Sequence, residues 1–76
     1  MEIKDFIEKF AEQFENVSAS ELTPTTKFKE LKEWSSLMAL SIIAMIDEEY
    51  DVTVKGNDIK VSETIEDLFN NVKSKC

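Results

Sequence analysis

The residues of this sequence that could do chemistry are two adjacent serines, Ser35 and Ser36, which lie directly before an apolar run. A hydroxyl there can cap the helix that the run predicts, because it accepts a hydrogen bond from a first-turn backbone N–H that has no helical partner. The same place suits a phosphate ester, since the positive end of the helix dipole favours negative charge. Viewed alone, such a pair is usually an ordinary helix cap, and only a wider pattern around it would favour a phosphate-linked group.

The composition argues against independent catalysis. The chain has no His and all nine of its basic residues are Lys, so it lacks a Ser–His pair, the commonest metal ligand and a guanidinium clamp for phosphates. Sixteen acidic residues give a formal charge of −7, whereas nucleic-acid binding normally requires a basic face. We therefore expect no catalytic residue, no metal site and no nucleic-acid partner.

The length and hydropathy favour one small domain spanning residues 1–76. Cys76 is the single cysteine, so an intramolecular disulfide is excluded. The first residues lack the apolar run of a signal peptide, and the longest nearly apolar run, 37–46, is about half of what a bilayer-spanning helix needs. We expect a cytoplasmic monomer that does not insert into membranes.

Apolar spacing predicts an all-α fold, a small bundle of three main helices plus one short helix with a long loop between the first and second helices. In chain order, the predicted elements are a helix over 3–16, a loop over 18–35, a helix over 37–50, an extended connector over 51–54, a short helical turn over 57–61 and a last helix capped by Thr64. Their apolar faces would form one core from Phe6, Phe10, Phe14, Ile42, Ile43, Ile46, Tyr50, Val54, Ile65, Leu68 and Phe69.

The second predicted helix has two features that its stability does not require. It is apolar nearly all round, so some apolar surface should stay exposed, and such surface often marks a contact site. It also ends with Asp47, Glu48 and Glu49, at the end of a helix where the dipole disfavours negative charge. The exposed apolar surface indicates a contact site, whereas the acidic end is either a partner contact or simply a solvated helix end.

Three segments together resemble the acyl carrier protein family. Residues 34–37 read W-S-S-L and match a W-D-S-L motif of that family at three of four positions. Residues 48–51 read E-E-Y-D, close to the acidic E-E-F-D type of ending of its second helix, and Phe28 stands where the family has an aromatic residue. The resemblance covers essentially the whole chain, and it implies a carrier rather than an enzyme.

The resemblance assigns Ser36 as the attachment site of 4'-phosphopantetheine, which a separate phosphopantetheinyl transferase would install. The arm would hold an acyl group as a thioester and present it to acyl-transferring or acyl-activating enzymes in fatty-acid, polyketide or specialised acyl metabolism. The family's Asp before the modified serine is Ser35 here. That departure leaves three possibilities: a divergent transferase, slow modification, or loss of the arm.

The resemblance also implies a partner-binding face on the second helix. Because its upper part is apolar, we expect an interface with a large apolar share and a basic patch opposite the acidic end. The matching positions are Leu37, Met38, Leu40, Ser41, Ala44, Asp47 and Glu48. The alternative is an unmodified acidic helical interaction module of the same fold, which docks through Leu37, Met38, Leu40 and Met45.

Overall fold

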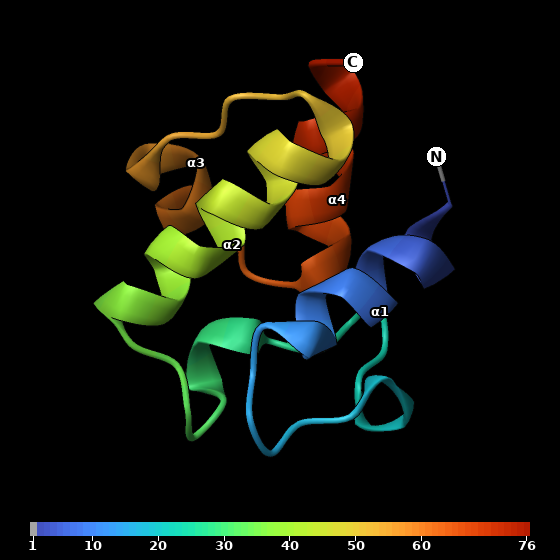
Figure 1. The fold of residues 1–76 in the computed structure, drawn as a ribbon, viewed down its shortest axis with the longest axis vertical. Coiled ribbons are helices and arrows are strands. Elements are labelled where there is room, and N and C mark those ends of the chain that lie inside the picture. The colour runs from blue at the N-terminus through green and yellow to red at the C-terminus, as the bar shows by residue number, and fades with distance from the viewer. Residues whose placement is uncertain (1) are drawn as a thin grey trace.

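The computed structural model describes residues 2–76, which form an all-helical fold without a strand in that range (Figure 1). It confirms the predicted three main helices, one short helix and long first loop. The elements are α1 (Ile3–Glu12), η1 (Ala19–Glu21), η2 (Phe28–Glu30), α2 (Ser36–Tyr50), α3 (Gly56–Val61) and α4 (Ile65–Ser74), where η1 and η2 are single 3₁₀ turns within the loop.

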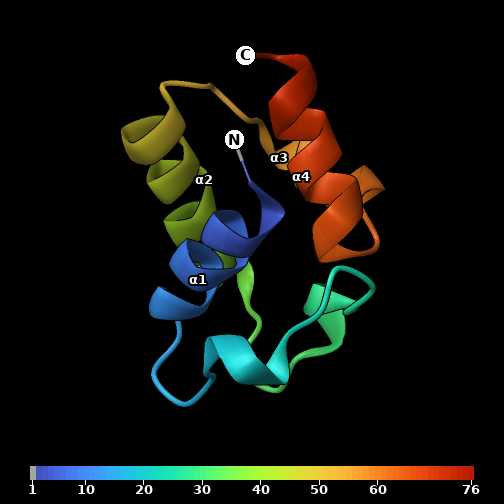
Figure 2. The same ribbon diagram turned by 90° about the vertical axis from the view of Figure 1, so that its right-hand side faces the viewer.

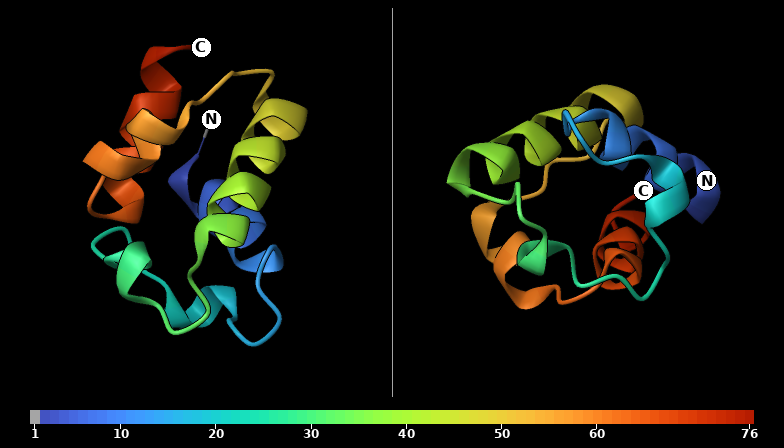
Figure 3. Two further views of the ribbon diagram at one scale, coloured as in Figure 1. Left: turned by 90° about the vertical axis from the view of Figure 1, so that its left-hand side faces the viewer. Right: turned by 90° about the horizontal axis from the view of Figure 1, so that it is seen from below.

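The helices enclose one core, and the long loop closes one end of it. The helix α1 contacts both α2 and α4, while the short α3 contacts α2 and α4. Figure 2 shows α1 and α2 together on one side, and Figure 3 shows α2 on one side of the core with α4 and α3 on the other. In these views the loop that joins α1 to α2 crosses beneath the helices.

The predicted core residues are buried with two exceptions, Ile43 and Tyr50, which are half-buried and pack against the core from its edge. The two valines of the extended connector, Val52 and Val54, are both buried. Further buried residues that were not in the predicted core are Ile7, Ala11, Leu22, Phe28, Met45, Ile59 and Val72.

The first helix is shorter than predicted: α1 ends at Glu12, whereas the prediction extended it to residue 16. Its end tightens, with the N–H of Gln13 bonded to the carbonyl of Phe10 and that of Phe14 to the carbonyl of Ala11. The Phe14 side chain thereby stays buried although it follows the helix. The apolar spacing that predicted a longer helix therefore continues through a turn that only partly keeps the helical geometry.

The long loop is ordered by contacts with the core and with α4. Phe28 is fully buried. The carbonyls of Pro24 and Thr26 accept hydrogen bonds from the first backbone N–H groups of α4, at 2.9 Å from Glu66 and 3.1 Å from Ile65. These bonds satisfy donors that a helix start leaves without a partner. The loop is thus part of the folded unit rather than a free tether.

The second helix begins at Ser36, one residue before the predicted start, and ends at Tyr50 as predicted. Asp51 ends it in the left-handed conformation, with φ 56° and ψ 42°. The N–H of Asp51 still bonds to the carbonyl of Asp47, at 3.0 Å. The chain then leaves in the extended connector toward α3, which begins at Gly56.

Candidate functional site

The two serines at the start of α2 have different roles. The Ser35 hydroxyl accepts a hydrogen bond from the backbone N–H of Met38 at 3.2 Å, so Ser35 is the N-cap of α2. Ser36 is the first helical residue, is exposed to solvent, and its hydroxyl makes no hydrogen bond within residues 2–76. The cap is therefore supplied without Ser36, whose hydroxyl remains available for chemistry.

The surroundings of Ser36 fit a covalently attached phosphate. The helix that follows is fifteen residues long, and its first turn contains no acidic side chain. A phosphodiester on the Ser36 oxygen would lie at the positive end of the α2 dipole, without a like charge from that turn. The exposed hydroxyl also leaves room for a flexible arm to extend into solvent.

Trp34 anchors the chain two residues before Ser36. Its ring meets Phe28 edge-on, with ring centroids 5.1 Å apart and an interplanar angle of 70°. It also stacks on Phe14, at 6.4 Å and 29°. Phe28 in turn packs edge-on against Phe10, 5.6 Å away. The aromatic residues of α1, the loop and the serine junction therefore form one continuous cluster.

Glu33 holds the same junction by its carboxylate. One oxygen, Oε1, accepts the backbone N–H of Glu15 at 3.1 Å, and the other, Oε2, accepts that of Asn16 at 3.0 Å. Sequence reasoning did not single out this residue. A side chain that pairs with backbone groups seventeen and eighteen positions away leaves no signal in local spacing.

The predicted partner-binding residues divide into an exposed group and a half-buried pair. Leu37 and Leu40 are 73% and 62% exposed, while Met38 and Ser41 are half-buried. The remaining members, Ala44, Asp47 and Glu48, are exposed. Together these exposed side chains cover one side of α2 from the serine junction to its acidic end.

One detail of the sequence interpretation is wrong on this face. Met45 is buried, with 5% exposure, so it is unavailable for the docking that the interaction-module alternative assigned to it. A 100° rotation per residue places Met45 next to Ile42 and Ile46 on the core side of α2. A third large apolar side chain, that of Val61 at the end of α3, is 64% exposed.

One of the three acidic residues at the end of α2 has a structural role. The carboxylate of Glu49 lies 3.7 Å from the ammonium group of Lys9, which links α2 to α1. The expectation that the fold gives no reason for all three acidic residues is therefore wrong for Glu49. Asp47 and Glu48 form no ion pair within the described part of the chain.

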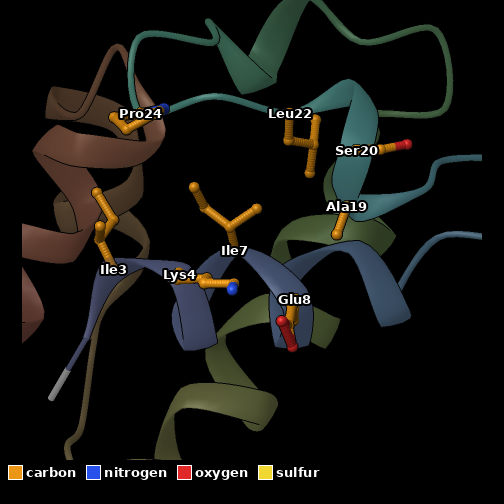
Figure 4. A pocket seen from close by; sticks show the side chains of 8 residues that line it. All are labelled: Ile3, Lys4, Ile7, Glu8, Ala19, Ser20, Leu22 and Pro24. Carbon is orange, nitrogen blue, oxygen red and sulfur yellow. The ribbon is translucent and has the colours of Figure 1, made fainter.

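An apolar pocket of about 400 Å³ lies away from this face (Figure 4). The helix α1 forms one wall of it, and the first part of the loop forms the other. Its lining residues are Ile3, Lys4, Ile7, Glu8, Ala19, Ser20, Leu22 and Pro24. Since none of them belongs to α2, this pocket does not adjoin the serine junction.

Two further properties concern residues 2–76 alone. Within them, no three Cys, Asp or Glu side chains gather in a way that could hold a metal ion. None of their helices combines the length and the apolar character that crossing a membrane requires.

The comparisons with known proteins agree with this geometry. No curated protein matches the sequence. The sequence model of the family described as "phosphopantetheine attachment site" matches residues 5–72, which is most of the chain. Domains of this family carry covalently attached 4'-phosphopantetheine, are generally non-catalytic, and work with a phosphopantetheinyl transferase and acyl-handling enzymes. The chain therefore belongs to the phosphopantetheine-attachment family and is a carrier protein of the acyl-carrier type.

Proposed function

We propose that the protein is an acyl carrier protein whose phosphopantetheine arm is attached to Ser36. The observation that supports this most directly is the division of labour at the start of α2, where Ser35 caps the helix and Ser36 presents an exposed hydroxyl without a hydrogen-bond partner in residues 2–76. When bound, the arm supplies a terminal thiol that carries an acyl group as a thioester.

Loading of Ser36 is a phosphoryl-type transfer from coenzyme A. The serine oxygen forms a bond to the phosphorus that bears the pantetheine arm, while the bond from that phosphorus to adenosine 3',5'-bisphosphate breaks. The hydroxyl proton passes to a base that the transferase supplies, since this chain has no His and the first turn of α2 has no acidic residue. The carrier itself contributes the exposed hydroxyl and the helix N-terminus that favours the new negative charge.

The partner face runs along α2. Its upper part offers Leu37 and Leu40, and its lower part offers the carboxylates of Asp47 and Glu48. An enzyme that matches this surface has an apolar patch beside the entrance to its active site and a basic patch farther along. Such charge complementarity mainly accelerates encounter and sets specificity. Partners of this kind are the acyl-activating and acyl-transferring enzymes of fatty-acid, polyketide or specialised acyl pathways.

An unmodified interaction module is the second candidate. The two exposed leucines fit it as well as they fit a carrier, since exposed apolar side chains also serve direct docking. The absence of the motif's Asp, replaced by Ser35, favours it. The two functions differ in whether a transferase adds the arm.

The test is the intact mass of the protein after co-expression with a broad-specificity phosphopantetheinyl transferase. We expect the mass of one phosphopantetheine arm to be added. Ser36→Ala should abolish this addition, whereas Ser35→Ala should still permit it, and peptide mapping should place the phosphodiester on Ser36. Unmodified wild-type protein would favour the interaction module, and an arm on Ser35 would overturn the assignment of Ser36.

A further inference from the structure

We propose that Glu33 is a positioning residue for the loading of Ser36, an inference that rests on the proposed function. The Glu33 carboxylate uses both of its oxygens on two consecutive backbone N–H groups, those of Glu15 and Asn16, at 3.1 and 3.0 Å. Hydrogen bonds to an ionised acceptor are stronger than those between neutral groups. Two such bonds accepted by one carboxylate fix both its orientation and its distance from the donors.

The two N–H groups have no other partner in the helix that precedes them. The helix α1 ends at Glu12, and the last tightened bonds at its end are donated by Gln13 and Phe14. The chain at Glu15 and Asn16 has therefore left the helix, and its donors point to the carboxylate instead. Glu33 thus fastens the turn that follows α1 to the segment that precedes α2.

The next residue, Trp34, contacts the same turn through its aromatic ring. Its ring stacks on Phe14, which directly precedes Glu15 and Asn16, and it meets Phe28 edge-on. The backbone N–H of Trp34 also closes a turn with the carbonyl of Leu31, at 3.0 Å. Glu33 supplies a polar contact and Trp34 an apolar contact to the turn at 14–16, so movement of one would disturb the other.

The two hydrogen bonds from the N–H groups of Glu15 and Asn16 to Glu33 are called the clamp here. Glu33 lies only three residues before Ser36, which carries the reactive hydroxyl. Between them, Ser35 is fixed by its own hydrogen bond to the N–H of Met38. Ser36 is therefore held from both directions, by α2 after it and by the clamped pair Glu33 and Trp34 before it. Without the clamp, the start of α2 would be joined to α1 through a long loop whose last residues lack this fastening.

The loading reaction makes this placement useful. The transferase must align the Ser36 oxygen with the phosphorus of coenzyme A, and small errors of alignment reduce the rate of such a transfer strongly. The transferase would still bind the exposed face of α2 if the clamp were broken. The loss should therefore appear in kcat, with little change in KM.

The experiment compares three variants that separate position from charge. Glu33→Gln removes the charge and one acceptor, whereas Glu33→Asp keeps the charge and shortens the side chain by one methylene. Glu30→Gln makes the same charge change in the same loop, at an exposed carboxylate that forms no hydrogen bond or ion pair in residues 2–76. Kinetics of transfer from coenzyme A are measured for each, together with hydrogen exchange of the Glu15 and Asn16 amides.

A fourth variant controls for general loss of stability. The Asp67 carboxylate also accepts two consecutive backbone N–H groups, those of Glu63 and Thr64 at 3.2 and 3.1 Å, but it does so at the start of α4. Asp67→Asn therefore removes the charge that strengthens this pair of bonds, without touching the serine junction. Circular dichroism confirms the helical content of every variant.

We expect both Glu33 variants to lose about tenfold in kcat and to exchange the two amides faster, while Glu30→Gln and Asp67→Asn load like the wild type. Wild-type kinetics in both Glu33 variants would overturn the positioning role and leave the attachment at Ser36 intact. An equal loss in Asp67→Asn would reduce the effect to stability and also overturn it. If the wild type itself accepts no arm, the proposed function fails and this inference with it.

Discussion

The helices α4 and α2 differ in the charges that they carry at their two ends. In α4 the Thr64 hydroxyl accepts the N–H of Asp67 while the Asp67 carboxylate accepts that of Thr64, so each end of this capping box supports the other. Acidic side chains occupy its first turn and Lys73 its last, as the helix dipole favours. In α2 the first turn has no acidic residue, the last turn has no basic one, and Asp51 ends it in a left-handed conformation.

Their surfaces differ in the same way. The buried residues of α4 form one stripe toward the core, consisting of Ile65, Leu68, Phe69 and Val72. The helix α2 buries Ile42, Met45 and Ile46 but also exposes Leu37 and Leu40. A sequence that satisfies stability at every position of one helix and departs from it along another usually uses the second for function. The departures of α2 lie at the serine junction and along the partner face.

The largest expected effect comes from reversing the charges at the acidic end of α2. Asp47→Lys with Glu48→Lys should slow transfer to or from partner enzymes by about tenfold at low salt, with the loss in the association rate, because steering by opposite charge accelerates encounter. High salt should shrink the difference. The fold should stay intact or gain slightly, since lysines suit a helix C-terminus.

The matched control is Glu8→Lys with Glu12→Lys, which makes the same charge change at two exposed positions of α1. Partner kinetics of this control at low and high ionic strength give the contribution of net charge alone. Equal slowing in both double variants would mean that the acidic end of α2 is merely solvated. Met38→Glu tests the apolar part of the same face, and its effect should be less sensitive to salt.

The second prediction concerns acid stability and the carboxylates that hold α3 and α4. The backbone N–H of Lys55 lowers the pKa of Asp58, and the backbone N–H groups of Thr64 and Glu63 lower the pKa of Asp67. A lowered native pKa stabilises the fold above the ordinary aspartate pKa of about 3.9. That stabilisation is lost as the pH falls through the native pKa.

The free energy of unfolding should therefore decrease as the pH falls below about 4. Asp58→Asn and Asp67→Asn should each destabilise the protein at neutral pH and flatten this acid dependence. Asp58 also accepts a hydrogen bond from the Asn71 amide, at 3.3 Å, and pairs with Lys75 at 3.8 Å, so its loss should loosen α3 from α4. Urea titrations at several pH values measure both effects, and an unchanged pH profile in the two variants would contradict the assignment.

The sequence predicts the architecture well because the helices leave local signals in the spacing of residue types. Apolar spacing located the three main helices and a turn signal the short one, and α2 and α3 each begin within one residue of the prediction. The main error, a first helix predicted to reach residue 16, has a physical cause. The helix tightens after Glu12, and the N–H groups of Glu15 and Asn16 that follow are bonded to Glu33 from a distant part of the chain.

The site is predicted less completely, for the same reason. The serine junction and the exposed leucines follow from a local motif and from an apolar run that is longer than one buried face requires. The separation of Ser35 as cap from Ser36 as exposed hydroxyl required the structure. So did the clamp of Glu33 and the pairing of Glu49 with Lys9, since both join side chains to groups far away in sequence.

The third prediction addresses the C-terminal end of α2. Asp51 adopts φ 56°, a conformation that costs a residue with a Cβ atom more than it costs Gly. Asp51→Gly should therefore stabilise the protein, by up to about 1 kcal/mol once the greater entropy loss of Gly on folding is subtracted. Asp51→Asn removes the unfavourable charge but keeps the side chain, so its gain should be smaller. Chemical denaturation gives the order, and a Gly variant less stable than the wild type would show that the Asp51 side chain contributes a contact of its own.

The smallest effect on stability, and the sharpest test of the contrast with α4, comes from giving α2 the cap charge that it lacks. Ser35→Asp can keep the hydrogen bond from the N–H of Met38. It also places a carboxylate in front of a first turn that has no acidic residue, which should add a few tenths to about 1 kcal/mol to the free energy of unfolding. Because it restores the family's motif, a general transferase should also load Ser36 faster than in the wild type. Thermal denaturation and loading kinetics measured on the same samples separate the two consequences: a more stable variant with an unchanged loading rate would assign the residue before Ser36 to the helix alone.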